Sequence, residues 1–202
     1  MRFRGGRTQW LIRELGVDIE VDTSFAANPG QGMKDEAKSK ELEALNPNVR
    51  IPVLVDGDFV LTETCAIHMY LAKKYNSDLA PKDLKEQALM DSYAFWAMTE
   101  VEADALRTMF QGIGRVHPDF LEGGGPDKVA SNLARPMKAF EKWISGKEYL
   151  VGNRFTVADL NVANVFDWLV RGKYDFSPYP ETKKWLDKCL GRPANNPPKA
   201  RL

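Results

Sequence analysis

The sequence predicts a mixed α/β segment over residues 1–78, followed by an all-helical segment over residues 84–202. Helical and strand-like patterns alternate up to about residue 75, and no strand-like alternation occurs beyond residue 85. A turn-rich stretch that includes Pro81 separates the two halves. Mixed α/β sequence followed by uniform helix is typical of two domains, so we expect a domain boundary in this stretch.

Composition narrows the class of protein. The 202 residues contain 28 basic and 28 acidic side chains, and this balance argues against a nucleic-acid binder or a membrane-surface protein. No apolar stretch approaches the roughly 18 residues of a membrane span, and the N-terminus lacks the apolar core of a signal peptide. Cys65 and Cys189 are too far apart for a zinc or disulfide pattern. We therefore expect a soluble, cytoplasmic protein without a bound metal.

The first 45 residues predict a helix, a strand and a surface segment. Residues 10–15 place apolar side chains on one side of a short helix, which Gly16 can end in a left-handed conformation. Residues 17–21 alternate between apolar and polar side chains, as a half-buried strand does. Residues 34–45 are charged with sparse apolar side chains, which indicates either a surface helix or an irregular stretch.

A β-hairpin and a helix are expected next. Residues 51–55 and 59–61 are short apolar runs separated by Asp-Gly-Asp, and an Asp-Gly pair between apolar runs is a strong hairpin signal. Residues 64–75 then place apolar side chains on one face of a helix.

The remaining sequence predicts four helices. We expect them at residues 84–112, 127–144, 156–171 and 180–190. Pro136 should kink or split the second of these helices, because proline cannot donate a backbone hydrogen bond.

Residues 46–54 contain a proline at the start of the first hairpin strand. A cis bond before Pro52 would leave the N–H and C=O groups of Ile51 outside the sheet, free to pair with an extended peptide. An ordinary proline on an edge strand is the alternative interpretation.

A strand runs directly into a helix at residues 61–67. The hydroxyl of Thr64 and the first N–H groups of the helix suit a carboxylate, and the Glu63 side chain suits an ammonium group. Together they would match the head group of an α-amino acid. The alternative is that Thr62 or Thr64 merely caps the helix.

Residues 155–160 carry a folding signal. Thr156 and Asp159 have the spacing of a capping box, and Phe155 can pack on Leu160 as a hydrophobic staple. We interpret this segment as structural.

These segments occur in the order seen in cytosolic glutathione transferases, and the chain resembles that family over nearly its whole length. Residues 46–54 resemble the family segment N-P-x-G-x-V-P-x-L with its cis-proline, and residues 63–67 are similar to E-S-x-A-I. Residues 10–17 resemble the first-helix sequence W-L-L-E-E-L-G-V of bacterial members. Residues 152–160 resemble G-x-x-x-S/T-x-A-D-L, and residues 190–194 are close to a common R-P-A ending.

The resemblance implies a thioredoxin-like N-terminal domain that binds glutathione and an all-helical C-terminal domain. Carried over residue by residue, Ile51 would pair its backbone with the cysteinyl part of glutathione, beside cis-Pro52. Glu63 and Thr64 would bind the γ-glutamyl amino and carboxylate groups. Arg50 is the looser assignment, to the glycyl carboxylate.

The resemblance also implies glutathione as co-substrate, a hydrophobic electrophile as second substrate, and a homodimer. Tyr93, Trp96 and Glu100 on the expected long helix would line the second-substrate pocket. Core packing or ordinary helix surface is the alternative for all three residues.

The N-terminus departs from the family pattern. Family members begin with a strand, followed by a loop whose serine, tyrosine or cysteine stabilises the glutathione thiolate. That loop falls on residues 2–6, no residues remain for the strand, and residues 1–20 contain no serine, tyrosine or cysteine. Thr8 is the one hydroxyl there, and the catalytic residue is therefore unknown. Arg2, Arg4 and Arg7 either supply positive charge to the thiolate or are solvated surface arginines.

The missing strand has a structural consequence. In the family sheet the first strand lies between the second and third, so residues 17–21 would lose their ladder partner. We therefore expect that the natural start lies upstream of Met1. A milder departure is Val49, which stands where the family pattern usually has glycine.

Two functional classes follow from these features. The first is a glutathione transferase, with a glutathione-dependent lyase or ether-cleaving enzyme as a variant that the motifs do not separate. The second is a non-catalytic member that uses the fold as a binding or interaction module. The absent hydroxyl favours the second class, whereas Pro52, Glu63 and Thr64 favour ligand binding in both.

Overall fold

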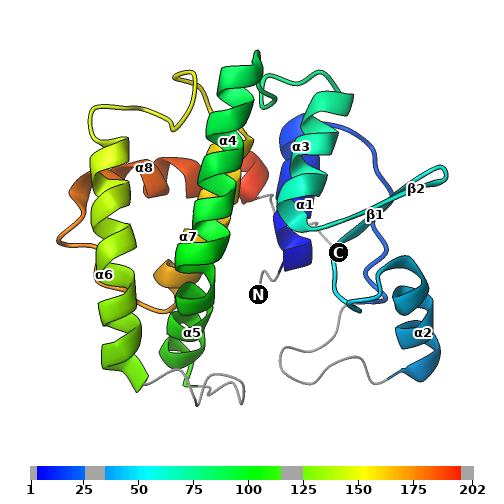
Figure 1. The fold of residues 1–202 in the computed structure, drawn as a ribbon, viewed down its shortest axis with the longest axis horizontal. Coiled ribbons are helices and arrows are strands. Elements are labelled where there is room, and N and C mark those ends of the chain that lie inside the picture. Colours follow the sequence, from blue (N-terminus) through cyan, green and yellow to red (C-terminus); the bar gives the residue numbers. More distant parts are fainter. Residues whose placement is uncertain (1–3, 26–34, 115–124, 197–202) are drawn as a thin grey trace. The chain divides into compact units, whose positions relative to one another are not determined.

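The computed structural model describes residues 4–25, 35–114 and 125–196. The chain divides into two compact units, Met1–Ser77 and Asp78–Leu202 (Figure 1). The first unit combines helices with a hairpin, and the described part of the second unit is built of helices. Within the described ranges, no helix is both long and apolar enough to cross a membrane.

The first unit is built from three helices and a β-hairpin. Its elements are α1 (Arg4–Leu15), α2 (Glu36–Leu45), β1 (Val53–Asp56), β2 (Phe59–Thr62) and α3 (Thr64–Lys74). The strands β1 and β2 are antiparallel, with Val53 opposite Thr62 and Asp56 opposite Phe59. Helix α1 packs against α3 and buries Trp10 and Leu11. The predicted hairpin is confirmed.

Residues 17–21 do not form the predicted strand. Val17 and Ile19 are half-buried while Asp18 and Glu20 are exposed, so the side chains alternate as a strand would require. Among the described residues, however, the sheet consists of β1 and β2 alone. A strand needs a neighbour for its N–H and C=O groups, and the described chain offers this segment none.

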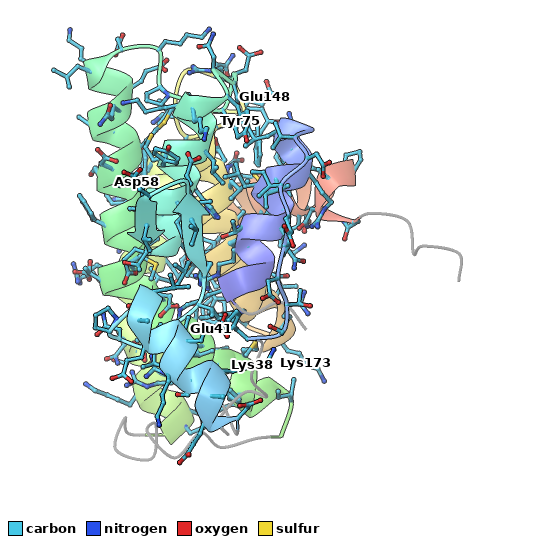
Figure 2. All side chains as sticks on the ribbon, turned by 90° about the vertical axis from the view of Figure 1, so that its right-hand side faces the viewer. Lys38, Glu41, Asp58, Tyr75, Glu148 and Lys173 are labelled. Atoms are coloured by element: carbon cyan, nitrogen blue, oxygen red, sulfur yellow. The ribbon has the colours of Figure 1, made fainter. Side chains whose placement is uncertain are left out.

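The segment expected as a surface helix or an irregular stretch is the helix α2. Asp35 caps its start by accepting the N–H groups of Ala37 and Lys38 at 3.0 and 3.2 Å. Leu42 is the one buried residue of this helix. Figure 2 labels Lys38 and Glu41 on α2. Its C-terminal residue Leu45 leads directly into the loop before Pro52.

A polar cluster fastens the hairpin to α3. The carboxylate of Asp56 accepts a hydrogen bond from the Tyr70 hydroxyl at 2.5 Å and forms an ion pair with Lys74. These hydrogen bonds, with Lys74 the stronger contributor, lower the pKa of Asp56. In Figure 2, Asp58 marks the hairpin turn and Tyr75 the residue that follows α3. The cluster fixes the orientation of the hairpin relative to α3.

The second unit has α7 as its central helix. Its elements are α4 (Leu84–Trp96), the π-helical turn η1 (Ala97–Val101), α5 (Glu102–Gly112), α6 (Gly125–Ile144), α7 (Val157–Arg171), α8 (Pro180–Leu190) and the 3₁₀ turn η3 (Pro193–Asn195). Helix α7 packs against α4, α5 and α8, and twelve of its residues are buried. Figure 1 shows α7 behind α4 and α5.

Two helix predictions for this unit need correction. The single helix expected over residues 84–112 is interrupted by the π-helical turn η1. Of the kink or split expected at Pro136, the split does not occur, since α6 continues through that residue, and the kink stays a prediction. Proline removes one backbone donor, and the buried side chains of Leu133, Pro136 and Met137 on the packed face of α6 compensate for that loss.

Asp159 joins three parts of the second unit. Its fully buried carboxylate accepts the Leu150 N–H at 2.8 Å and the Trp185 indole N–H at 2.9 Å. It also accepts the N–H and hydroxyl of Thr156 at 3.0 and 3.1 Å. Burial raises the pKa of Asp159, against the opposing effect of these hydrogen bonds. The predicted capping box is confirmed, and it ties α7 to α8 as well as to its own start.

An arginine fastens the beginning of the second unit. Both carboxylate oxygens of Glu86 accept from the Arg154 guanidinium, at 2.9 and 2.6 Å. Arg154 also donates to the carbonyl groups of Asp78 and Ala80. The hydrogen bonds from Arg154, and secondarily the one from the Lys82 N–H, lower the pKa of Glu86 to about 2.

Candidate functional site

Four of the predicted site residues come together at one end of the hairpin. The last pair of the ladder is Val53 opposite Thr62. The next residue on each side is Pro52 and Glu63, so the two segments that the sequence singles out leave the sheet at the same end. Neighbouring strands lie about 5 Å apart, and an extended ligand at this end can therefore contact both segments.

Glu63 has an unusual backbone conformation. It occupies the N-cap position of α3 with φ 68° and ψ 119°, and its carbonyl oxygen accepts the Ile67 N–H at 2.9 Å. Residues other than glycine rarely adopt a positive φ, at a cost of about 1–3 kcal/mol, and such residues concentrate at ligand-binding and active sites. Glu63 is therefore a strained residue at the junction of β2 and α3.

The first turn of α3 has no side-chain cap. Its N-cap residue is Glu63, whose side chain makes no capping hydrogen bond. The alternative that Thr62 or Thr64 caps the helix is therefore not what the structure shows. The Glu63 side chain is exposed, and Thr64 is only 7% exposed at the first helical position. The N–H groups of this turn can receive an anion beside an exposed carboxylate.

The loop before β1 presents the backbone of Ile51. The Ile51–Pro52 peptide bond is cis, as the sequence pattern allows. Ile51 precedes β1, and among the described residues its N–H and C=O groups make no backbone hydrogen bond. The Ile51 side chain lies 3.7 Å from the position that a Cβ on Gly5 would take, so the start of α1 adjoins this loop.

Asn46 organises the same loop, and the sequence analysis gave it no role. Its side-chain N–H donates to the Arg50 carbonyl at 2.8 Å, and its side-chain oxygen accepts the Asn48 N–H at 3.0 Å. Val49, between them, has φ 51°, in the left-handed region that suits the glycine of the family pattern. The Arg50 side chain is exposed. The Asn at the start of the quoted motif was the one available signal for this network.

The expected exposure of the arginines at the start of α1 needs one correction. Arg7 is only 3% exposed, so the expectation that these arginines are solvated on the surface is wrong for it. Arg4 is half-buried, and Arg2 lies outside the described residues. The Thr8 hydroxyl lies 3.3 Å from the imidazole Nε2 of the buried His68 on α3. This hydroxyl therefore takes part in the contact between α1 and α3.

Tyr93 and Trp96 belong to an aromatic cluster in the second unit. The Trp96 ring stacks on Phe140 at 5.5 Å between centroids, and the Tyr93 ring meets Trp143 edge-on at 5.7 Å. Burial, and secondarily the charge of Asp159, raises the pKa of Tyr93, so its hydroxyl stays protonated. Both residues are half-buried and pack on other aromatic rings, and their place in a second-substrate pocket stays a prediction.

Glu100 lies apart from this cluster. It is in the π-helical turn η1 and forms an ion pair with Arg135 of α6. Its partner is mostly exposed. In the described part of the chain, no group of three or more histidine, cysteine or acidic side chains could hold a metal ion.

Comparisons with known proteins agree with the resemblance. Residues 1–73 match the glutathione S-transferase N-terminal domain, and residues 122–193 match the glutathione S-transferase C-terminal domain. Glutathione S-transferase 3 of Zea mays is 32% identical over 206 residues, which cover 93% of this chain and 85% of that protein. Glutathione S-transferase theta-1 of Bos taurus is 34% identical over 134 residues, which cover 63% of this chain. The match spans only 55% of the bovine protein's length.

The fold is shared with solved structures. A glutathione S-transferase-I bound with the ligand lactoylglutathione superposes with a TM-score of 0.75 at 28% identity. The superposition covers 96% of this chain and 92% of that one. The predicted fold class, a thioredoxin-like N-terminal part followed by an all-helical C-terminal part, is confirmed. The chain belongs to the glutathione S-transferase family.

Proposed function

We propose that this protein is a glutathione transferase that conjugates glutathione to a hydrophobic electrophile. The observation that carries the proposal is the convergence at one end of the hairpin. Three features meet there: the Ile51 backbone, which makes no backbone hydrogen bond within the described ranges, cis-Pro52, and the strained Glu63, whose side chain does not cap α3. Each group matches a different part of an extended γ-glutamyl tripeptide.

Glutathione would bind in the following way. The Glu63 carboxylate would accept from the γ-glutamyl ammonium group, and the Thr64 hydroxyl and the first N–H groups of α3 would donate to its carboxylate. The backbone of Ile51 would pair with the cysteinyl residue in the manner of strand addition, with Pro52 beside it. The exposed Arg50 side chain would reach the glycyl carboxylate.

The chemical step is a nucleophilic substitution or addition at the electrophile. The cysteinyl thiol has an ordinary pKa near 8.5, so its proton must be lost to solvent for the thiolate to attack. The thiolate sulfur forms a bond to an electrophilic carbon, and in a substitution the leaving group departs with its electron pair. Because Ile51 adjoins Gly5, the sulfur would lie near the start of α1, where the helix dipole and the arginines favour negative charge.

The second substrate would contact the aromatic side chains of the second unit. Tyr93 is half-buried, and its neighbour Trp143 is 38% exposed, which leaves apolar surface for a hydrophobic electrophile. Such an activity would suit detoxification in the cytoplasm.

A homodimer is part of the proposal. Leu84 and Phe95 on α4 are 81% and 70% exposed, and Val55, Phe59 and Val60 on the hairpin are also exposed. Exposed large apolar side chains favour association. Sedimentation equilibrium should give twice the mass of the chain, and Phe95→Asp should reduce that mass to one chain.

The test uses retention and turnover. The protein should be retained on immobilised glutathione, Glu63→Ala should not be, and a generic aryl halide should be conjugated in the presence of glutathione. Failure of the parent protein to bind glutathione would refute the proposed site. Binding without turnover would support the non-catalytic alternative.

A further inference from the structure

Asn46 uses its side chain and its backbone for different tasks. Its backbone N–H donates to the Leu42 carbonyl at 2.8 Å and so completes the last turn of α2. Its side chain takes no part in that bond. The residue is 4% exposed, and its carboxamide instead holds two backbone groups of the loop that leads to Pro52.

The hydrogen bond to Arg50 acts directly on Ile51. The Arg50 carbonyl and the Ile51 N–H belong to the same planar peptide unit, in which they point in opposite directions. Because the Asn46 side chain holds this carbonyl at 2.8 Å, it also fixes the direction of the Ile51 N–H. Among the described residues, that N–H makes no backbone hydrogen bond.

We propose that Asn46 is a positioning residue for glutathione: its carboxamide aims the Arg50–Ile51 peptide at the cysteinyl part of the ligand. The inference rests on the proposed function. The second bond, from the Asn48 N–H, and the bond from the Val49 N–H to the Asn46 carbonyl at 2.8 Å hold the intervening residues in place. An ordered loop of this kind spares the ligand the entropic cost of fixing Ile51.

The experiment compares Asn46→Asp, Asn46→Ala and the control Asn48→Ala. Aspartate keeps the size of the side chain and the acceptor for Asn48, but it places an oxygen against the Arg50 carbonyl. The Asn48 side chain is exposed, and alanine there retains the backbone N–H that Asn46 accepts. The Kd for glutathione, measured by calorimetry, should rise at least about tenfold in both Asn46 variants. It should stay within about twofold of the parent in the control.

The melting temperature separates positioning from plain stability. A folded Asn46→Asp protein with the parent Kd would overturn the inference, whatever its melting temperature. If the Asn46 variants do not fold, hydrogen exchange on the parent decides. Saturating glutathione should slow exchange of the Ile51 amide, and an unchanged rate would overturn the inference.

A different result would implicate the proposed function instead. If the parent does not bind glutathione, the proposed glutathione site is refuted, and this result does not test the positioning role of Asn46. Hydrogen exchange without ligand then tests the positioning role. The Asn48 amide should exchange faster in Asn46→Ala, which removes its acceptor, than in the parent, and equal rates would contradict the role of the carboxamide.

Discussion

The two units of the chain are stabilised in different ways. In the second unit, α7 is surrounded by helices, and one buried carboxylate, Asp159, ties its start to the preceding loop and to α8. In the first unit, the described sheet is a single hairpin, and the segment after α1 has strand-like exposure without a strand partner. Polar contacts in that unit hold individual segments: Asp56 holds the hairpin to α3, and Asn46 holds the loop before the hairpin.

The two units also differ in where buried polar groups and strained backbone conformations occur. In the second unit, the buried pair Thr156 and Asp159 forms a capping box that serves folding. The first unit places two non-glycine residues, Val49 and Glu63, at positive φ within 15 positions of each other, on either side of the hairpin. The second unit also has non-glycine residues at positive φ, Asn153 and Lys173, both in turns. The difference is that in the first unit the strained residues flank the hairpin that carries the candidate ligand site.

The largest expected effect is in the second unit, at Asp159. Replacing Asp159 by alanine leaves the N–H groups of Leu150, Thr156 and Trp185 buried without their acceptor. We expect the free energy of unfolding to fall by at least about 3 kcal/mol, measured by urea denaturation. The exposed Asp127→Ala on α6 should change it by no more than about 0.5 kcal/mol. Equally small changes in the free energy of unfolding for Asp159→Ala and Asp127→Ala would contradict the structural role given to Asp159.

The next largest effect is expected from a comparison of two glycine-to-alanine variants, one in each unit. A Cβ on Gly172 would lie 2.5 Å from the backbone carbonyl carbon and oxygen of Thr108, where α5 and α7 approach each other. Gly172→Ala should therefore lower the free energy of unfolding by about 2–3 kcal/mol. Gly5→Ala in the first unit meets Ile51 at an ordinary 3.7 Å and should be tolerated. If thermal unfolding ranks these two variants the other way, the tight packing assigned to the second unit is wrong.

The smallest effect is a gain, in the first unit. Val49 has φ 51°, a conformation that costs a β-branched residue more than glycine. Val49→Gly should raise the free energy of unfolding by about 1 kcal/mol, with the greater freedom of the unfolded glycine chain limiting the gain. Chemical denaturation measures it, and Arg50→Gly in the same loop serves as the control. A loss of stability in Val49→Gly would show that the side chain matters more than the backbone conformation.

Local patterns in the sequence were sufficient for most of the fold. The Asp-Gly pair at residues 56–57 predicted the hairpin, and Thr156 with Asp159 predicted the start of α7, because each signal depends on neighbours in the chain. Residues 17–21 were predicted wrongly, since alternation describes one strand and says nothing about its partner. The split at Pro136 was predicted wrongly for the related reason that tertiary packing outweighs a single lost hydrogen bond.

The candidate site was less accessible to sequence reasoning. The motifs singled out Ile51, Pro52, Glu63 and Thr64, and the hairpin register then placed these residues at one end of the sheet. The role of Asn46 depends on a hydrogen bond across four residues of loop, which no spacing rule encodes. The burial of Arg7 depends on what surrounds α1, and a single arginine in a helical pattern gives no sign of it.

The central claim is that the first unit recognises glutathione through Glu63. Its most direct test is calorimetric titration of glutathione into the parent protein, Glu63→Gln and the control Asp58→Asn. Glutamine keeps the size of the side chain and removes its charge, and Asp58 is exposed at the opposite end of the hairpin, labelled in Figure 2. We predict one site per chain, a Kd at least about tenfold weaker in Glu63→Gln, and no change in Asp58→Asn. Equal affinity of Glu63→Gln and the parent protein would contradict the account.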